Sequence, residues 1–109
     1  MGLDEDLKER FDIDEMFDNG RAAAGFLKAM AHEGRLMILC HLIKGEKSVT
    51  ELENLLSSRQ AAVSQQLARL RLEGIVDYRR DGKAIYYTIK DPKVYKLISL
   101  LYEEFCSTT

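Results

Sequence analysis

Two cysteines, Cys40 and Cys106, are the residues of this chain whose chemistry is most distinctive. A thiolate binds soft metals, attacks electrophiles and is readily oxidised, whereas a protonated thiol is far less reactive. Two cysteines are too few for the disulfide framework of a small secreted protein and too few for a self-contained zinc site. If they have a function, we expect it to be that of reactive thiols.

The sequence around the cysteines offers no clear means of activating them. Cys40 falls on the apolar side of a predicted helix, a placement that is also typical of an unreactive buried cysteine. The residues that share this side are Leu36, Leu39 and Ile43. Cys106 follows Glu103 and Glu104 at the negative end of the last predicted helix, which disfavours a thiolate, although its place after Phe105 leaves the thiol accessible.

The residue patterns of enzymes are missing from the chain. It has no Cys-x-x-Cys, no paired acid and base and no glycine-rich cofactor loop, so we expect neither a thiol oxidoreductase nor a cofactor. No apolar run approaches the roughly 20 residues that span a bilayer, and the N-terminus is acidic where a signal peptide would be basic. We therefore expect a cytoplasmic binding protein that is not an enzyme.

The stretch from Ser57 to Gly74 points to a kind of partner. On a helical wheel Val63, Leu67 and Leu70 fall on one side, which suits a core. The opposite side carries only small or hydrogen-bonding residues, namely Ser58, Ala61, Ala62, Gln65 and Arg69. Such a surface can approach a duplex closely and bond to base edges or phosphates. An ordinary amphipathic helix has the same pattern, so the flanking elements decide between the two interpretations.

A capped helix precedes this stretch. Ser48 and Glu51 have the spacing of a capping box, ahead of a helix that we expect to end at Leu56. A turn at Ser57 and Ser58 leads into the next helix, and either serine is able to cap it. Helix, short turn and helix is the helix-turn-helix arrangement, in which the second helix enters the major groove.

A charged hairpin follows the same stretch. Two β-rich runs flank Asp81-Gly82, a strong hairpin signal, and Arg79, Arg80 and Lys83 lie near its tip. Such a ribbon suits a wing that lays cations on the DNA backbone. The whole chain has a net charge of −2, which by itself argues against DNA binding. The segment from residue 57 to residue 83, however, has six basic and three acidic residues and is therefore basic.

The remaining segments predict packing helices and a dimer. We divide the chain into an acidic, partly ordered extension over residues 1–19 and one winged helix-turn-helix DNA-binding and dimerisation domain over residues 20–109. Three further helices are expected. The first spans Arg21–Ala31, and the second ends at Gly45. The third begins after Asp91 as a cap, with Pro92 at its first position. The last helix has more apolar surface than a terminal helix needs, which predicts a homodimer through terminal helices. Its apolar residues are Val94, Ile98, Leu101, Tyr102 and Phe105.

The order of elements and several local strings resemble the ArsR family of winged-helix repressors over residues 21 to about 105. The strings are FLKAMAHEGRLMILCHL, SVTEL and RQAAVSQQLARLRLEGIVDYRRDGKAIYYTI, with Gln60, Ser64, Gln65 and Leu67 matching the recognition-helix pattern and the Gly82 hairpin matching the wing. The resemblance implies a mainly α, winged helix-turn-helix homodimer that represses transcription from an inverted-repeat operator. The DNA-contacting residues that it implies are Ser57, Ser58, Gln60, Ser64, Gln65, Arg69, Arg80 and Lys83.

The chain departs from the metal sensors of that family. Where the family's metal site has a Cys-x-Cys string, this sequence has Ser48 and Thr50, whose hydroxyls are poor ligands for soft metals. A second family site uses Asp and His on the terminal helix, and residues 93–106 contain neither. We therefore expect no metal site, while a metal-responsive repressor of this fold stays an alternative.

The placement of Cys40 and Cys106 is similar to that in the BigR/SqrR subgroup of the family, and the string HEGRLMILCHL is especially close to it. The resemblance implies a repressor that leaves its operator when reactive sulfur species link the two thiols through a di- or polysulfide bridge. A peroxide- or disulfide-sensing redox repressor of the same fold is a further alternative.

Overall fold

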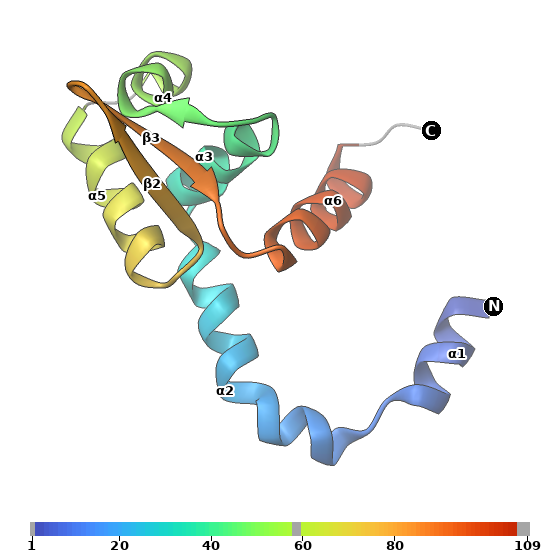
Figure 1. Cartoon of the computed structure of the whole chain (residues 1–109). Coiled ribbons are helices and arrows are strands. Elements are labelled where there is room, and N and C mark those ends of the chain that lie inside the picture. Colours follow the sequence, from blue (N-terminus) through green and yellow to red (C-terminus); the bar gives the residue numbers. More distant parts are fainter. Residues whose placement is uncertain (1, 58–59, 107–109) are drawn as a thin grey trace.

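The computed structural model describes residues 2–57 and 60–106, and it shows a helical body with a small antiparallel sheet (Figure 1). In these two ranges the elements are α1 (Gly2–Arg10), α2 (Ile13–Met30), α3 (Glu33–Ile43), β1 (Lys47–Ser48), α4 (Val49–Leu56), α5 (Gln60–Leu72), β2 (Val76–Asp81), β3 (Ala84–Ile89) and α6 (Lys93–Phe105). This order confirms the winged helix-turn-helix that the sequence predicts. No helix in the described ranges is both long and apolar enough to cross a membrane.

The core lies where α3, α4, α5 and the sheet meet. Helix α5 buries Val63, Leu67 and Leu70, as its helical-wheel pattern predicts, and α4 buries Leu52 beside them. Burying a leucine side chain contributes about 1.5–3 kcal/mol. The apolar side of α5 is therefore fully used by this core, and its other side is left to face outward.

Helix α3 is turned differently from the prediction. Its fully buried residues are Ile38, Leu39 and Leu42, whereas Leu36 and Cys40 are only half-buried. The reason is that α3 packs against α2, α4, α5, α6 and β3, so its apolar residues meet neighbours on several sides instead of forming one inward stripe. Cys40 lies on the margin of the core, not in it.

The sheet has three strands in the order β1-β3-β2. The predicted hairpin is present, but its two turn residues are Gly82 and Lys83, because Asp81 still pairs with Ala84. Gly82 has a φ of +63°, which glycine adopts without steric cost. Strand β1 is not predicted from the sequence, since a strand of two residues has no periodicity to detect.

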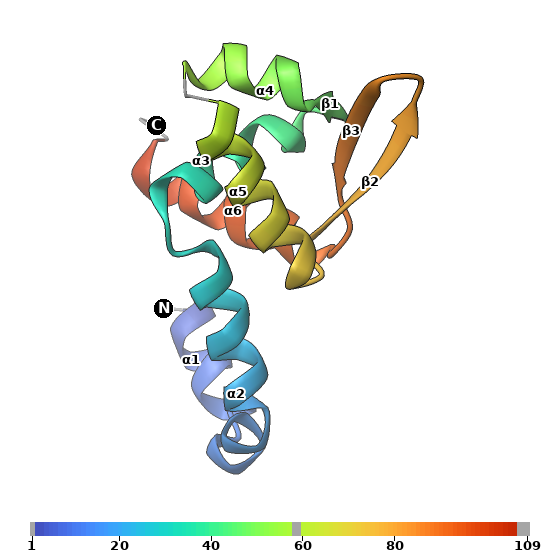
Figure 2. The same ribbon diagram turned by 90° about the vertical axis from the view of Figure 1, so that its left-hand side faces the viewer.

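The N-terminal helices extend away from this body (Figures 1 and 2). Helix α2 is longer than the predicted helix over Arg21–Ala31 and begins at Ile13, where the Asp12 side chain accepts a hydrogen bond from the Glu15 amide. It runs unbroken through residue 19, the predicted boundary between extension and domain. That division stays a prediction.

Helix α6 is only half covered. The helix begins at Lys93, one residue later than predicted, so that Pro92 and not Asp91 is the capping residue; the Asp91 carboxylate still accepts a hydrogen bond from the Lys93 amide at 3.0 Å. Val94 and Ile98 are buried against the body, but Tyr102 and Phe105 are 61% and 83% exposed. The apolar stripe of this helix therefore continues beyond the core of one chain.

Candidate functional site

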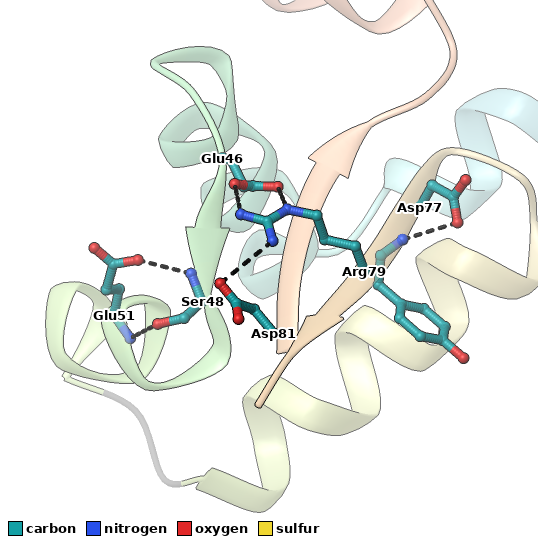
Figure 3. A network of polar contacts seen from close by, with 7 residues as sticks. Glu46, Ser48, Glu51, Asp77, Arg79 and Asp81 are labelled. Atoms are coloured by element: carbon teal, nitrogen blue, oxygen red, sulfur yellow. Dashed lines mark hydrogen bonds and ion pairs between the residues drawn. The ribbon is translucent and has the colours of Figure 1, made fainter. Parts of the chain in front are cut away.

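The first part of the candidate DNA-binding surface is the turn between α4 and α5. The Ser48 hydroxyl accepts a hydrogen bond from the Glu51 amide at 3.0 Å, and the Glu51 carboxylate accepts one from the Ser48 amide at 2.7 Å (Figure 3). This predicted capping box fixes the start of α4. Ser57 ends the helix in the left-handed conformation and is exposed, while Ser58 lies outside the described residues.

The second part is the outward side of α5. Gln60 is the first residue of the helix, and Ser64, Gln65 and Arg69 are exposed one to two turns further on. The Arg69 guanidinium forms an ion pair with Glu73 at 3.2 Å. An exposed pair of this kind is worth at most about 1 kcal/mol, so Arg69 stays able to exchange its carboxylate for another anion.

The third part is the wing, where Arg80 and Lys83 are exposed. Arg79, expected at the tip with them, instead points to the loop before β1 and makes two hydrogen bonds of 2.8 Å to the Glu46 carboxylate (Figure 3). Its guanidinium also lies 3.8 Å from an Asp81 oxygen and 4.7 Å from the Tyr86 ring centre. Because of this pairing, the pKa of Glu46 is lowered and that of Arg79 is raised.

Contacts at the base of the hairpin join the wing to α5. The Arg71 guanidinium lies 4.3 Å from the ring centre of Tyr78, and Tyr78 in turn packs on Tyr87 across the strands at 5.8 Å. These contacts place the hairpin beside the recognition helix (Figure 1). The base of the wing therefore packs against the end of α5, whereas Arg80 and Lys83 lie further out, near the turn of the hairpin.

The thiols lie elsewhere, on two helices that pack against each other. Cys40 is half-buried in α3, Cys106 is exposed at the end of α6, and neither forms a disulfide. Burial raises the pKa of Cys40 above that of an ordinary thiol, and negative charge on Cys106 raises it further. The two sulfurs are therefore near enough for the charge of one to act on the other.

Across residues 2–57 and 60–106, no cluster of three or more His, Cys, Asp or Glu side chains could hold a metal ion. The positions that match the family's Cys-x-Cys string are occupied differently, since Ser48 caps α4 and Thr50 is exposed in its first turn.

Two polar contacts of this region are not predicted from the sequence. One is the Glu46–Arg79 pair, and the other is a hydrogen bond of 2.9 Å from Arg35 on α3 to Gln66 on α5. The partners are 33 and 31 residues apart, and neither pair follows a helix or strand period. No local pattern in the sequence could have found them.

Known proteins share this fold and sequence. The model of the protein family described as "Bacterial regulatory protein, arsR family" matches residues 32–78 of this chain. The biofilm growth-associated repressor of Agrobacterium fabrum is 44% identical over 106 residues, which cover 93% of this chain and 91% of that protein. The crystal structure of the transcriptional repressor BigR from Xylella fastidiosa has a TM-score of 0.85 at 39% identity, covering 90% of this chain and all of that one.

A structure described as reduced HlyU from Vibrio cholerae has a TM-score of 0.80 at 43% identity, covering 85% of this chain and 98% of that one. Shared fold and identity of this extent over nearly whole chains go well beyond a common architecture. The chain therefore belongs to the arsR family of bacterial regulatory proteins and is a DNA-binding transcriptional regulator, not an enzyme.

Proposed function

We propose that the protein is a homodimeric repressor, acting in the cytoplasm, that leaves its operator when reactive sulfur species link Cys40 to Cys106. The observation that carries the proposal is the placement of these two thiols on packed helices, α3 and α6, within electrostatic reach of each other. The names of two relatives, a biofilm growth-associated repressor and the repressor BigR, support repression.

For the DNA-bound form, we assign base contacts to Gln60, Ser64, Gln65 and Arg69 of α5. Phosphate contacts fall to Ser57 and Ser58 in the turn and to Arg80 and Lys83 on the wing. The exposure of Ser64, Gln65, Arg80 and Lys83 supports this assignment. Side-chain amides and hydroxyls read base edges, whereas cations on a hairpin neutralise phosphates.

For the dimer, we assign the uncovered apolar side chains of the terminal helices to contact with a second copy. These side chains are Leu7, Phe11, Ile13, Met16, Phe17, Tyr95, Leu100, Tyr102 and Phe105. They lie on α1, α2, α6 and the residues joining α1 to α2. A monomer that left so many large apolar groups in water would be unusual, and a two-fold dimer also matches an inverted-repeat operator.

The sensing chemistry starts at the more accessible thiol. The Cys106 thiolate attacks the sulfane sulfur of a persulfide, the S–S bond breaks, the thiol RSH leaves, and Cys106 becomes a persulfide. Cys40 then attacks the inner sulfur of that group, and the outer sulfur leaves as H₂S while a disulfide forms. If both cysteines are first persulfidated, the same displacement gives a trisulfide and H₂S. The cysteines are oxidised in each case, and a sulfane sulfur is reduced to sulfide.

The length of the bridge offers a source of selectivity. A simple disulfide requires Cα atoms within about 7 Å of each other, whereas a polysulfide spans more. A coupling of about 1–3 kcal/mol between thiol state and DNA changes the affinity roughly 5–150-fold, which is enough for a switch. The bridge would act by tying α6 to α3 and so shifting the dimer and its two recognition helices.

The test is a DNA-binding titration of reduced and persulfide-treated protein, with mass spectrometry of the cysteine peptides from the same samples. We expect a crosslink of Cys40 to Cys106 and a loss of affinity within the range above. Cys40→Ser and Cys106→Ser should bind DNA when reduced and stay bound after treatment. The switch is disproved if either variant still releases DNA fully, or if a complete crosslink leaves the wild-type affinity unchanged.

A redox repressor that responds to peroxide is the second candidate, since one similar structure is described as reduced HlyU. Peroxide oxidises a thiolate to a sulfenic acid, which condenses with a second thiol to a disulfide and water. A parallel titration with hydrogen peroxide separates the candidates. Release by peroxide at the concentration at which persulfide acts would favour the redox repressor.

A further inference from the structure

Arg35, in the first turn of α3, makes contacts that join three helices. Its Nε donates a hydrogen bond of 2.6 Å to the carbonyl oxygen of Ala29, next to the end of α2, and its Nη1 donates one of 2.9 Å to Oε1 of Gln66 on α5. Both bonds are partly buried. The last carbonyls of a helix have no partner within it and carry partial negative charge, so a guanidinium is well suited to bind one.

The first turn of α3 is also fixed locally beside Arg35. His32 caps the helix through a hydrogen bond of 3.0 Å from the Gly34 amide to its Nδ1. A Cβ atom at Gly34 would lie 3.1 Å from the His32 ring and 3.8 Å from Cγ of Gln66. The missing side chain of Gly34 therefore leaves room for the His32 ring that caps α3, and Gln66 lies at ordinary van der Waals distance from the same position.

Arg35 and Cys40 lie on different sides of the same helix. They are five residues apart, which turns their side chains by about 140° round α3 at 3.6 residues per turn. Helix α3 thus binds the recognition helix through Arg35, and it also packs against α6, which is followed by Cys106. A rigid helix that is held on both sides transmits a displacement from one side to the other.

We propose that Arg35 is a positioning residue that sets the orientation of the recognition helix through Gln66. Anchored on Ala29, it fixes α5 relative to α2 and α3, and it makes α3 the element through which the state of the thiols reaches α5. The proposal rests on the proposed function in that α5 reads DNA and the two thiols control it.

The test is a double-mutant cycle with Arg35→Met, Gln66→Met and the double variant, each as the reduced full-length protein. The DNA is a duplex selected from random sequence for binding to the wild type. Each single variant should bind it about tenfold more weakly, the effect of ~1.4 kcal/mol, and the double variant no more weakly than the weaker single variant. Additive losses in the double variant, or none in the singles, would overturn the proposal.

Two readouts separate positioning from a direct DNA contact and from loss of fold. The slope of log affinity against log salt should equal that of the wild type in all three variants, because no phosphate contact is removed. The second readout is the ratio of the DNA affinities of the reduced and the persulfide-treated protein. In Gln66→Met this ratio should fall towards one. In Gln66→Glu, which restores an acceptor for Arg35, it should return towards the wild-type ratio. A change of slope, or an unchanged ratio beside a wild type that responds, counts against the proposal.

Thermal unfolding of each variant provides the control for folding, and Arg35→Lys replaces Arg35→Met if the latter does not fold. Lysine keeps the charge but cannot reach both acceptors with a planar fork, so it should also lower the affinity. If the wild type crosslinks without losing affinity, the persulfide switch fails, and the cycle on the reduced protein still decides whether Arg35 positions α5.

Discussion

The helix-turn-helix with its wing differs from the helices α2 and α6 in how far its apolar residues are buried. In α5 every apolar residue of the predicted stripe is buried, and the exposed residues of that helix are mostly polar or small. In α2 and α6 large side chains such as Phe17 and Phe105 are each 83% exposed. The core of the winged helix-turn-helix is thus covered within one chain, whereas large apolar side chains of α2 and α6 are left uncovered by it.

The largest expected effect is on the stability of the folded chain. Leu67→Ala removes a fully buried side chain from the centre of the core and should lower the free energy of unfolding by about 2–5 kcal/mol. Thermal or urea unfolding of the reduced protein measures it. Leu72→Ala, at an 83% exposed position on the same helix, is the matched control and should change little. Equal losses in the two variants would contradict the placement of the core.

A substitution in the terminal helix α6 should instead change how tightly two copies of the chain associate. Phe105→Ser is expected to weaken the dimer more than tenfold, which corresponds to about 1.4 kcal/mol, while leaving the secondary structure intact. Sedimentation at several protein concentrations measures the dissociation constant. Lys96→Ser, at an exposed polar position of α6, is the control. A Phe105→Ser protein that dimerises like the wild type would show that this face serves another purpose.

A change of pH should alter the reactivity of the thiols, and this distinguishes them from the DNA-reading surface. Because the pKa of Cys40 is raised, little of it is thiolate near neutrality, and closure of the bridge should become about tenfold faster per pH unit below that pKa. The folded chain also holds this proton more tightly than the unfolded chain does, so stability present at neutral pH is lost as pH rises through the thiol range. Rapid-quench mass spectrometry follows the rate, and a rate independent of pH would place the slow step elsewhere.

The smallest expected effect is on DNA binding by the wing, where it distinguishes Lys83 from Arg79. Lys83→Ala should weaken DNA binding and reduce the salt slope by about 0.9 for each phosphate that the lysine neutralises. Arg79→Ala should weaken binding with the slope unchanged, because Arg79 is engaged by Glu46 and serves to hold the hairpin. Fluorescence anisotropy over a salt series measures both. Equal changes of slope would mean that Arg79 leaves Glu46 for a phosphate on binding.

Local patterns in the sequence were enough for most of the DNA-reading part. The stripe Val63, Leu67 and Leu70, the capping box of Ser48 with Glu51, and the hairpin at Gly82 each depend on residues within a few positions of one another. Helix and strand geometry fixes how such neighbours point, so their spacing predicts their structure. The family resemblance rested on this segment and also on the string FLKAMAHEGRLMILCHL, which lies in α2 and α3.

Only the tertiary structure decided which residues of α3 are buried, where Arg79 points, and that Arg35 joins α2 to α5. The sequence determined that α3 would be an apolar helix, but its orientation depends on five neighbouring elements that surround it. Likewise, Arg79 and Arg35 meet partners 33 and 31 residues away, and their hydrogen bonds form only once the chain has folded back. Contacts between residues distant in the chain depend on how whole elements pack, and no periodicity along the chain encodes that packing.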